Sequence, residues 1–565
     1  MRNSPPSHHR GRSLLLAGAL AALSACTSKE TPVGGGATGG TVVIDAPSDP
    51  STLFPPLISE EVGRWIQDLV FDRLAQIGPT MVTVGDKGFT PELAKAWTWA
   101  PDSLSIAFSI DPRARWHDGQ PVTAKDVRYS FQLFTDPKVG SSSASTLTNV
   151  DSVSVRDSLT AVVWFKKRSP EQFYDAVYQI IVMPEHVYGK VPMDQLRTSP
   201  VTRTPIGSGR FRFSKWDVGQ RIELLADTAN YRGRAKLDRL LIVPADPQTQ
   251  VARVLSGEAD VMEAFPSDQT AKLDSSKVAA AVIWPTLGYA FIGMNLHAGA
   301  TSAPHPIFGD ARVRRALSMA VDRQAMLTNV FGKLGLLSHG PFAAGFGLAD
   351  TTIQLPPFDT TAAKALLDSA GWKAATPGAI RTKNGKPLQF AVMAPSSSVP
   401  RRQYAVLIQA ALRRVGAQVD IQIVDPRSVM YPKMNSGDFD AVINAFNPDP
   451  SITGTAQYWA TGAAPPNGQN YLRYANRDVD ALLDSAAKSF DPAKAKQYAS
   501  RAYKDIAADA PAIWLYDYVL VNAVNRRIDT APFRVDGWWV NLPDWSIPQD
   551  KRIERDRIGL APAKP

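Results

Sequence analysis

The stretch DPQTQVARVLSGEADVMEAFPSD, residues 246–268, decides the fold because its design occurs a second time in the chain. The second copy, DPRSVMYPKMNSGDFDAVINAFNPD, occupies residues 425–449, and a strand-like run precedes each copy, at 240–243 and 419–424. Each copy predicts a strand, a helix ended by a glycine, and a returning strand, which is a right-handed βαβ crossover. We therefore expect two α/β lobes of similar construction. The alternative is that two short βαβ units look alike by chance.

The two copies also predict where a ligand would bind. In open parallel sheets, ligands bind beyond the carboxyl ends of the strands. We therefore expect the loops after Phe265 and Phe446 to face a shared cleft.

Other segments show the same mixture of strand and helix patterns. Apolar and small residues alternate over 104–110, which is the period of a half-buried strand. Thr123 and Asp126 have the spacing of a capping box at the start of a helix. Asp310 and Thr361 are expected to open two further helices. The chain is therefore α/β in class.

The composition is that of a multi-domain globular protein. The chain has 565 residues, of which 44% are hydrophobic and 9% aromatic. The formal net charge is +9, but charges of both signs are interspersed, and the pairs Arg314-Arg315 and Arg413-Arg414 are expected on solvated helix faces. We therefore expect a monomer with no nucleic-acid partner.

Cys26 is the only cysteine of the sequence and lies near its beginning. Three arginines and an apolar run over 14–23 precede it, which is typical of a secretory signal. Leu23-Ser-Ala-Cys26 resembles the bacterial lipobox, and this resemblance implies cleavage before Cys26 and a lipid on its thiol. The protein would then be extracytoplasmic and held to a bacterial membrane by that lipid alone. An incidental cysteine behind an ordinary signal peptide is the alternative.

Catalytic and cofactor motifs are missing from the sequence. Gly34, Gly36 and Gly39 match G-x-G-x-x-G, but they precede the predicted strand at 41–44 instead of following a strand. There is no G-x-S-x-G, H-E-x-x-H or Walker pattern, and the histidines are scattered. We therefore expect no catalytic residue, no cofactor and no metal site.

A series of motifs over nearly the whole mature chain resembles one known family. The motifs are, in order, Trp116-His-Asp-Gly119, Ala124-Lys-Asp-Val127, Thr204-Pro-Ile-Gly-Ser-Gly209, Asn230-Tyr-Arg-Gly233, Asp310-Ala-Arg-Val-Arg-Arg-Ala-Leu317 and Tyr474-Ala-Asn476. Their joint order is similar to that of the bacterial extracellular solute-binding proteins of family 5, which include oligopeptide-, dipeptide- and nickel-binding components of ABC importers. Most of these residues are expected to be structural, Trp116 as a core aromatic beside a tight turn.

The resemblance implies a two-lobed periplasmic-binding-protein type II fold with an extra α/β subdomain inserted in lobe I. The implied parts are a signal peptide at 1–25, a Gly-rich tether at 26–40, lobe I at 41–80, 200–285 and 515–565, the inserted subdomain at 81–199, and lobe II at 286–514. Chain crossings between the lobes would be hinge strands that permit closure around a ligand. The protein would bind a solute without a chemical step and deliver it to ABC transporter permease subunits.

Asp449 and Phe446 are the strongest candidates for ligand binding. In peptide-binding members of the family, an aspartate three residues after an aromatic residue pairs with the ligand's α-amino group, and these two residues keep that spacing. A proline precedes the acid here, and Phe446 stands where tryptophan is frequent. The alternative is that Asp449 only caps a turn among the neighbouring prolines.

Weaker candidates follow from the same resemblance. Relatives contact ligand in the loop after the first strand, which here contains Asp49, Ser51 and Thr52. The strand that enters lobe II contains Tyr289 and Phe291, and both could equally be core residues.

Trp459 offers a further aromatic surface on which a ligand could stack, but no sequence motif marks it as a binding residue. Peptide is the expected cargo, with nickel chelates, sugars or other small solutes as alternatives. A lipid-anchored hydrolase, or a receptor or assembly protein that has lost its cargo, would be a different class of function.

Overall fold

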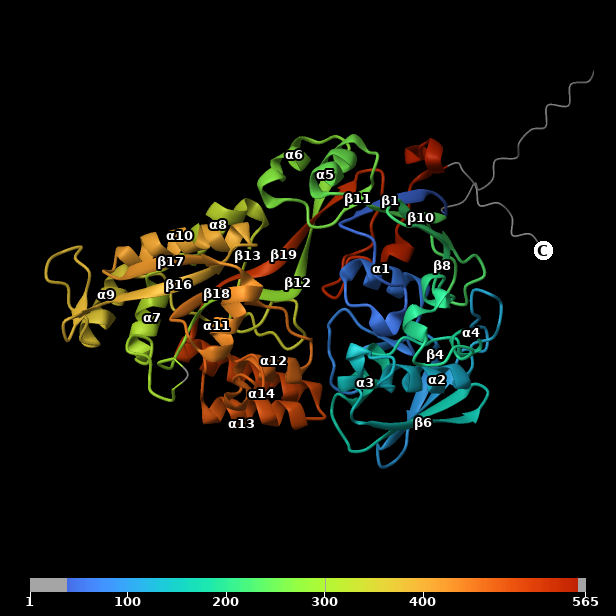
Figure 1. Cartoon of the computed structure of the whole chain (residues 1–565), viewed down its shortest axis with the longest axis horizontal. Coiled ribbons are helices and arrows are strands. Elements are labelled where there is room, and N and C mark those ends of the chain that lie inside the picture. The colour runs from blue at the N-terminus through green and yellow to red at the C-terminus, as the bar shows by residue number, and fades with distance from the viewer. Residues whose placement is uncertain (1–37, 300, 557–565) are drawn as a thin grey trace, which may run out of the picture. The chain divides into compact units, whose positions relative to one another are not determined.

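A computed structural model describes residues 38–299 and 301–556, and most of its strands belong to one sheet (Figure 1). The strand order is β17-β16-β18-β12-β19-β11-β1-β10-β9-β8, and β13 pairs with β19. The strands are β1 (Thr41–Ala46), β8 (Phe211–Asp217), β9 (Arg221–Ala226), β10 (Arg239–Pro244), β11 (Val261–Met262), β12 (Ala279–Met294), β13 (Leu336–Leu337), β16 (Gln389–Pro395), β17 (Gln418–Val424), β18 (Ala441–Phe446) and β19 (Ala512–Asn525).

The two sequence copies fold as equivalent units. In the first, β10 leads through α5 (Pro247–Ser256) to β11, and both strands lie parallel to β1, which separates them. In the second, β17 leads through α11 (Tyr431–Ser436) to β18, and both lie parallel to β16. Gly257 and Gly437 end the helices at φ angles of 83° and 81°, a left-handed conformation that glycine adopts without strain. The predicted strand–helix–strand repeat is confirmed.

Two long strands connect the halves of the sheet. β12 and β19 pair antiparallel along most of their length, and the regular register is broken between Pro285 and Tyr289 of β12. Figure 1 shows both strands running from one half of the sheet to the other. The broken register at 285–289 is where the paired strands can change direction most readily.

A separate four-stranded sheet, in the order β4-β5-β7-β6, lies within the segment predicted as an insert. Its elements are β4 (Ala94–Trp99), β5 (Ser105–Ile110), β6 (Val150–Asp157) and β7 (Thr160–Phe165), with helices α2 (Ala124–Thr135), α3 (Gln172–Tyr178) and α4 (Glu185–Tyr188). The alternating strand and the capping box at Thr123 and Asp126 are confirmed. Trp116 is buried beside the turn at Gly119, as expected.

The remaining elements cover the sheets or connect them. They are α1 (Glu61–Val70), β2 (Ala75–Ile77), β3 (Phe89–Pro91), α6 (Ala271–Ser275), α7 (Ala311–Met319), α8 (Arg323–Phe331), α9 (Thr360–Ser369), β14 (Thr382–Lys383), β15 (Lys386–Pro387), α10 (Val399–Arg413), α12 (Ile452–Trp459), α13 (Arg477–Lys488) and α14 (Pro492–Asp509), with short 3-10 turns between them. Among the described residues, no helix combines the length and apolar character needed to span a bilayer.

Two helix predictions need correction. Asp359, not Thr361, caps α9, because its carboxylate accepts the backbone N–H groups of Thr361 and Ala362. Arg314 is buried instead of solvated, since its guanidinium donates to the backbone carbonyl of Phe308, which precedes α7, and to that of Asp509, the last residue of α14. The signal peptide, Cys26 and most of the tether lie outside the described residues.

Candidate ligand-binding site

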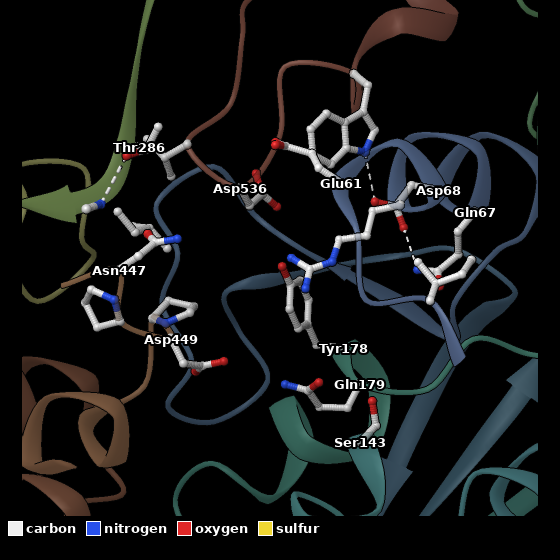
Figure 2. Close-up of a pocket in the computed structure, with 18 of the residues that line it drawn as sticks. Glu61, Gln67, Asp68, Ser143, Tyr178, Gln179, Thr286, Asn447, Asp449 and Asp536 are labelled. Carbon is white, nitrogen blue, oxygen red and sulfur yellow. Dashed lines mark hydrogen bonds between the residues drawn. The ribbon is translucent and has the colours of Figure 1, made fainter. Parts of the chain in front are cut away.

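A cavity of about 670 Å³ lies against the interrupted part of β12. Its wall comes from α1, the end of α3, residues 286–288 of β12, the loop after β18, and residues 535–539. Figure 2 shows Asn447 and Asp449 on one side of this cavity and Glu61, Gln67 and Asp68 on the opposite side. The volume is within the range of about 300–1,000 Å³ that is typical of small-ligand sites.

Asp449 lies in the loop after β18 and is exposed to the cavity. Its carboxylate accepts hydrogen bonds from the Tyr174 hydroxyl at 3.0 Å and from the Ser451 backbone N–H at 3.1 Å. Among the described residues, no lysine or arginine forms an ion pair with it. Burial by the surrounding protein raises the pKa of Asp449, and the Tyr174 and Ser451 hydrogen bonds lower it in part. A carboxylate in this setting is a favourable partner for a cationic ligand group.

A second cavity, of about 760 Å³, shares Asp449 and Gln179 with the first. Glu171 and Asp175, from the segment predicted as an insert, line it as well. Burial raises the pKa of Asp175 to about 7, and the neighbouring charges of Glu171 and Asp449 act in the same direction. The surroundings of Asp449 are therefore electrostatically negative, which attracts a positive charge.

Helix α1 presents a polar face to the cavity. Its apolar side chains Val62, Trp65, Ile66 and Leu69 are buried in the core. The residues between them, Glu61, Arg64, Gln67 and Asp68, line the cavity. Spacings of three and four residues place side chains on the same side of a helix, so the amphipathic pattern turns this polar face toward the ligand space.

Arg73 and Asp68 form an ion pair in the same wall. Arg73 Nη1 lies 3.0 Å from the Asp68 carboxylate, and its Nε donates to the Tyr178 carbonyl at 2.9 Å. The indole N–H of Trp539 donates to the other Asp68 oxygen at 2.9 Å. These contacts neutralise Asp68 and hold Arg73 in place.

Two tyrosines of α3 provide an aromatic surface beside Asp449. Tyr174 and Tyr178 are one turn apart and stack with ring centroids 4.9 Å apart. Tyr178 lines the cavity, and Tyr174 reaches Asp449 with its hydroxyl. Stacked rings of this kind can support the flat groups of a ligand.

Four predicted aromatic candidates lie in the core instead of on the cavity wall. Phe446, Tyr289, Phe291 and Trp459 are at most 4% exposed. The Trp459 indole N–H donates to the Tyr289 hydroxyl at 3.0 Å, and the Phe291 and Phe446 rings lie 4.8 Å apart. Tyr289 and Phe291 on β12 and Phe446 on β18 lie inside the sheet, and Trp459 at the end of α12 packs against them, so packing explains their positions.

Three predicted residues of the loop after β1, Asp49, Ser51 and Thr52, do not line this cavity either. Asp49 accepts the Trp216 indole N–H at 3.3 Å and so anchors the β8–β9 hairpin. Ser51 binds the Glu60 carboxylate through its backbone N–H at 2.7 Å. Ser51 and Thr52 line a different cavity, of about 750 Å³. The structure thus brings only Asp449 of the predicted side chains into the wall of the cavity beside β12.

Sequence reasoning missed most of that wall. The missed residues are Glu61, Arg64, Gln67, Asp68, Arg73, Tyr178, Asp536 and Trp539, and Tyr174, which contacts Asp449 from the second cavity, was missed as well. The amphipathic pattern of α1 and the tyrosine pair four residues apart are visible in the sequence, but neither pattern says which cavity it faces.

Comparisons with known proteins agree with this architecture. Residues 88–468 match the family model of the bacterial extracellular solute-binding proteins, family 5 Middle. Oligopeptide-binding protein AppA of Bacillus subtilis is 26% identical over 515 residues, 87% of this chain and 90% of AppA. An AppA structure in complex with a nonapeptide matches with a TM-score of 0.67 at 23% identity, covering 91% of this chain and 99% of that one.

Two other solved structures show the same fold. The ABC transporter substrate-binding protein CtaP of Listeria monocytogenes matches with a TM-score of 0.77 at 20% identity, covering 91% of this chain and 100% of that one. NikZ of Campylobacter jejuni, in complex with Ni(L-His), matches with a TM-score of 0.67 at 22% identity, covering 90% and 99%. The α/β fold expected from the motifs is confirmed as one that matches family 5 structures, and the chain belongs to the bacterial extracellular solute-binding proteins of family 5, the non-catalytic binding components of ABC transporters.

Proposed function

We propose that this protein captures peptides and holds the amino-terminal ammonium group of the ligand at Asp449. One observation carries the proposal: the Asp449 carboxylate faces a cavity of about 670 Å³ and has no cationic partner among the described residues. The name of AppA as an oligopeptide-binding protein supports the same cargo class. Removing one member of a desolvated charge pair costs about 2–5 kcal/mol, which is enough to discriminate against ligands without an amine.

Closure about β12 and β19 would enclose the peptide. The broken register between Pro285 and Tyr289 lies beside the cavity and supports a hinge there. The lobes would then be 41–80, 200–285 and 515–565 on one side and 286–514 on the other, with 81–199 inserted in the first. This division explains why the cavity wall draws on both halves of the sheet.

A lipid on Cys26 would hold the protein at the outer face of a bacterial membrane, near the permease that receives the peptide. The lipobox-like Leu23-Ser-Ala-Cys26 supports this part of the proposal. Two or more acyl chains give stable attachment, at about 0.8 kcal/mol for each buried CH₂ group. Mass spectrometry of the protein from bacterial membranes should find a diacylglyceryl group on an N-terminal Cys26, and a free thiol there would contradict the anchor.

Binding can be tested by thermal unfolding of the purified protein with pooled peptides of two to nine residues. A binder gains about 2.7 kcal/mol when the ligand exceeds its Kd 100-fold, so Tm should rise. Asp449→Asn should weaken binding by tenfold or more, because the variant keeps the side-chain shape and loses the charge. Asp550→Asn, at an exposed position outside both cavities that Asp449 lines, is the matched control.

Three outcomes separate the alternatives. If Tm stays constant with every peptide pool and rises with nickel–histidine or a sugar, peptide is not the cargo and that solute is. Peptide binding that Asp449→Asn leaves unchanged would remove Asp449 from the site. Turnover of a peptide or ester reporter would contradict a pure binding protein.

A further inference from the structure

We propose that the second cavity beside Asp449 receives the side chain of the ligand's first residue, and that Asp175 selects lysine or arginine there. This inference rests on the proposed peptide function. It adds a side-chain preference to the cargo class and assigns a role to a cavity that the binding of the ligand's amino group leaves unused.

The second cavity, of about 760 Å³, is adjacent to the place where the ligand's amino group would lie. Asp449 and Gln179 line both cavities, and Figure 2 shows these two residues at the same end of the first one. The α-carbon that carries the amino group of a peptide also carries its first side chain. A ligand whose ammonium group lies at Asp449 therefore has its first side chain next to the second cavity.

Every charged side chain that lines the second cavity is a carboxyl group. These side chains are Glu171, Asp175 and Asp449, and no lysine or arginine of residues 38–299 and 301–556 lines it. Glycine and alanine residues between positions 454 and 463 form part of the wall and leave room for an alkyl stem. A hollow with negative charge and no cation of its own attracts a basic side chain.

The three carboxyl groups differ in the partners that the protein gives them. Glu171 accepts the Thr83 hydroxyl at 2.6 Å and the Ile452 backbone N–H at 3.1 Å. Asp449 is the proposed partner of the ligand's amino group. Asp175 is half-buried, and its carboxyl group forms no hydrogen bond or ion pair within the part of the chain that the structure describes. Asp175 is therefore the carboxyl group that remains for a second cation.

Helix α3 turns Asp175 toward the second cavity. Glu171 precedes the helix, Asp175 lies within it and Gln179 follows it, and all three line this cavity. They are four residues apart, a spacing that places side chains on the same side of a helix. Phe173 and Val177 of the same helix are buried in the core. The buried apolar side of α3 therefore fixes the direction of its acidic side.

The titration of Asp175 gives the selection a pH dependence. Burial, Glu171 and Asp449 raise the pKa of Asp175 to about 7, so only part of this group is charged at neutral pH. Glu171 faces it from the start of α3 and Asp449 from the loop after β18. A bound ammonium or guanidinium favours the charged carboxylate and displaces its proton. The preference for a basic side chain should therefore strengthen as pH rises through 7.

The experiment compares two pools of tripeptides that differ only in the first residue, which is lysine in one pool and norleucine in the other. Norleucine keeps the alkyl stem and lacks the ammonium group. Titration calorimetry of the purified protein should give a Kd about tenfold lower for the lysine pool at pH 8, and a smaller difference at pH 5.5. The same pair of residues placed last in the tripeptide should give equal Kd values.

Variants test the role of the carboxylate. Asp175→Asn should bind the two pools equally at both pH values, with the affinity that wild type shows for norleucine. Asp175→Glu keeps the charge and should keep a preference for lysine. Asp194→Asn, at an exposed position outside both cavities, should behave as wild type. Asp449→Asn should weaken the binding of both pools, which separates the amino-terminal contact from the side-chain contact.

The possible failures are distinguishable. If wild type binds the lysine and norleucine pools with the same Kd at pH 8, the role of the second cavity is overturned while the proposed peptide function stands. The same holds if Asp175→Asn keeps the preference for lysine, or if lysine is preferred equally at the last position. Circular dichroism of each variant excludes loss of fold as the cause. If no pool binds wild type, both the proposed function and this inference are rejected.

Discussion

Asp260 and Asp440 occupy the same position in the two βαβ units. Asp260 accepts the Val43 N–H of β1 at 2.9 Å, and Asp440 accepts the Ala391 N–H of β16 at 2.8 Å. Each aspartate therefore ties its returning strand to the central strand of its unit. The sequence shows that each aspartate lies three residues after its glycine, Gly257 or Gly437. It does not show that each aspartate accepts a hydrogen bond from the central strand of its unit.

Their surroundings differ, and this predicts different costs of substitution. Asp260 is fully buried and binds the buried Arg527 at 2.8 Å, whereas Asp440 is partly exposed and faces His305 at 3.2 Å. Asp260→Asn should lower the free energy of unfolding by about 1.5–3 kcal/mol, because the buried Arg527 loses a charged hydrogen-bond partner and keeps only Asp556. Asp440→Asn should cost about 1 kcal/mol. Urea denaturation measures both, and equal costs would contradict this comparison.

At the scale of elements, the site depends on the interrupted strand β12. A Cβ atom added to Gly288 would lie 2.8 Å from Tyr518 Cδ2, a distance that carbon atoms of real side chains do not reach. Tyr518 is on β19 and lines the cavity with Gly288. The close approach of these two strands therefore requires a residue without a side chain.

Gly288→Ala should displace the Tyr518 ring into the cavity and weaken peptide binding by several-fold, with a smaller effect on stability. The double variant Gly288→Ala with Tyr518→Ala removes the clash and should recover part of the lost affinity relative to the glycine variant alone. Calorimetric Kd values and Tm for the three proteins test this. Additive losses in the double variant would show that the clash is not the cause.

At the scale of the whole molecule, several carboxyl groups are buried, and their hydrogen bonds do not offset the loss of hydration of the charged form. Asp517 of β19 accepts the Ala344 N–H at 2.7 Å, and burial nevertheless raises its pKa to about 7. Burial raises the pKa of Asp175 to about 7 as well. In the unfolded chain both would titrate near 3.9. The folded state therefore binds more protons than the unfolded state between about pH 4 and 7.

Stability should fall as pH rises through this window, since stability decreases with pH wherever the folded state holds the extra protons. We expect Tm at pH 8 to be several degrees lower than at pH 5.5. Asp517→Asn should flatten this dependence, because the amide does not titrate. Scanning calorimetry at both pH values provides the measurement, and a Tm that rises toward pH 8 would contradict the assignment.

The sequence by itself determined the α/β class, the repeated strand–helix–strand unit and the family. These features depend on local patterns, such as the glycine helix stops at Gly257 and Gly437 and the capping box at Thr123, which act over a few residues. Asp449 could be named because the family resemblance implies an aspartate three residues after an aromatic residue, in a loop that follows a predicted strand.

Only the tertiary structure decided which side chains share the cavity. Periodicity shows that Tyr289 and Phe291 lie on a strand, but burial on both faces of the sheet puts them in the core. Arg64 is separated from Asp449 by 385 positions of the chain, and only the pairing of β12 with β19 places their elements around one cavity. Charge compensation is likewise a property of neighbours in space, so the sequence could not show that Arg73 is paired with Asp68.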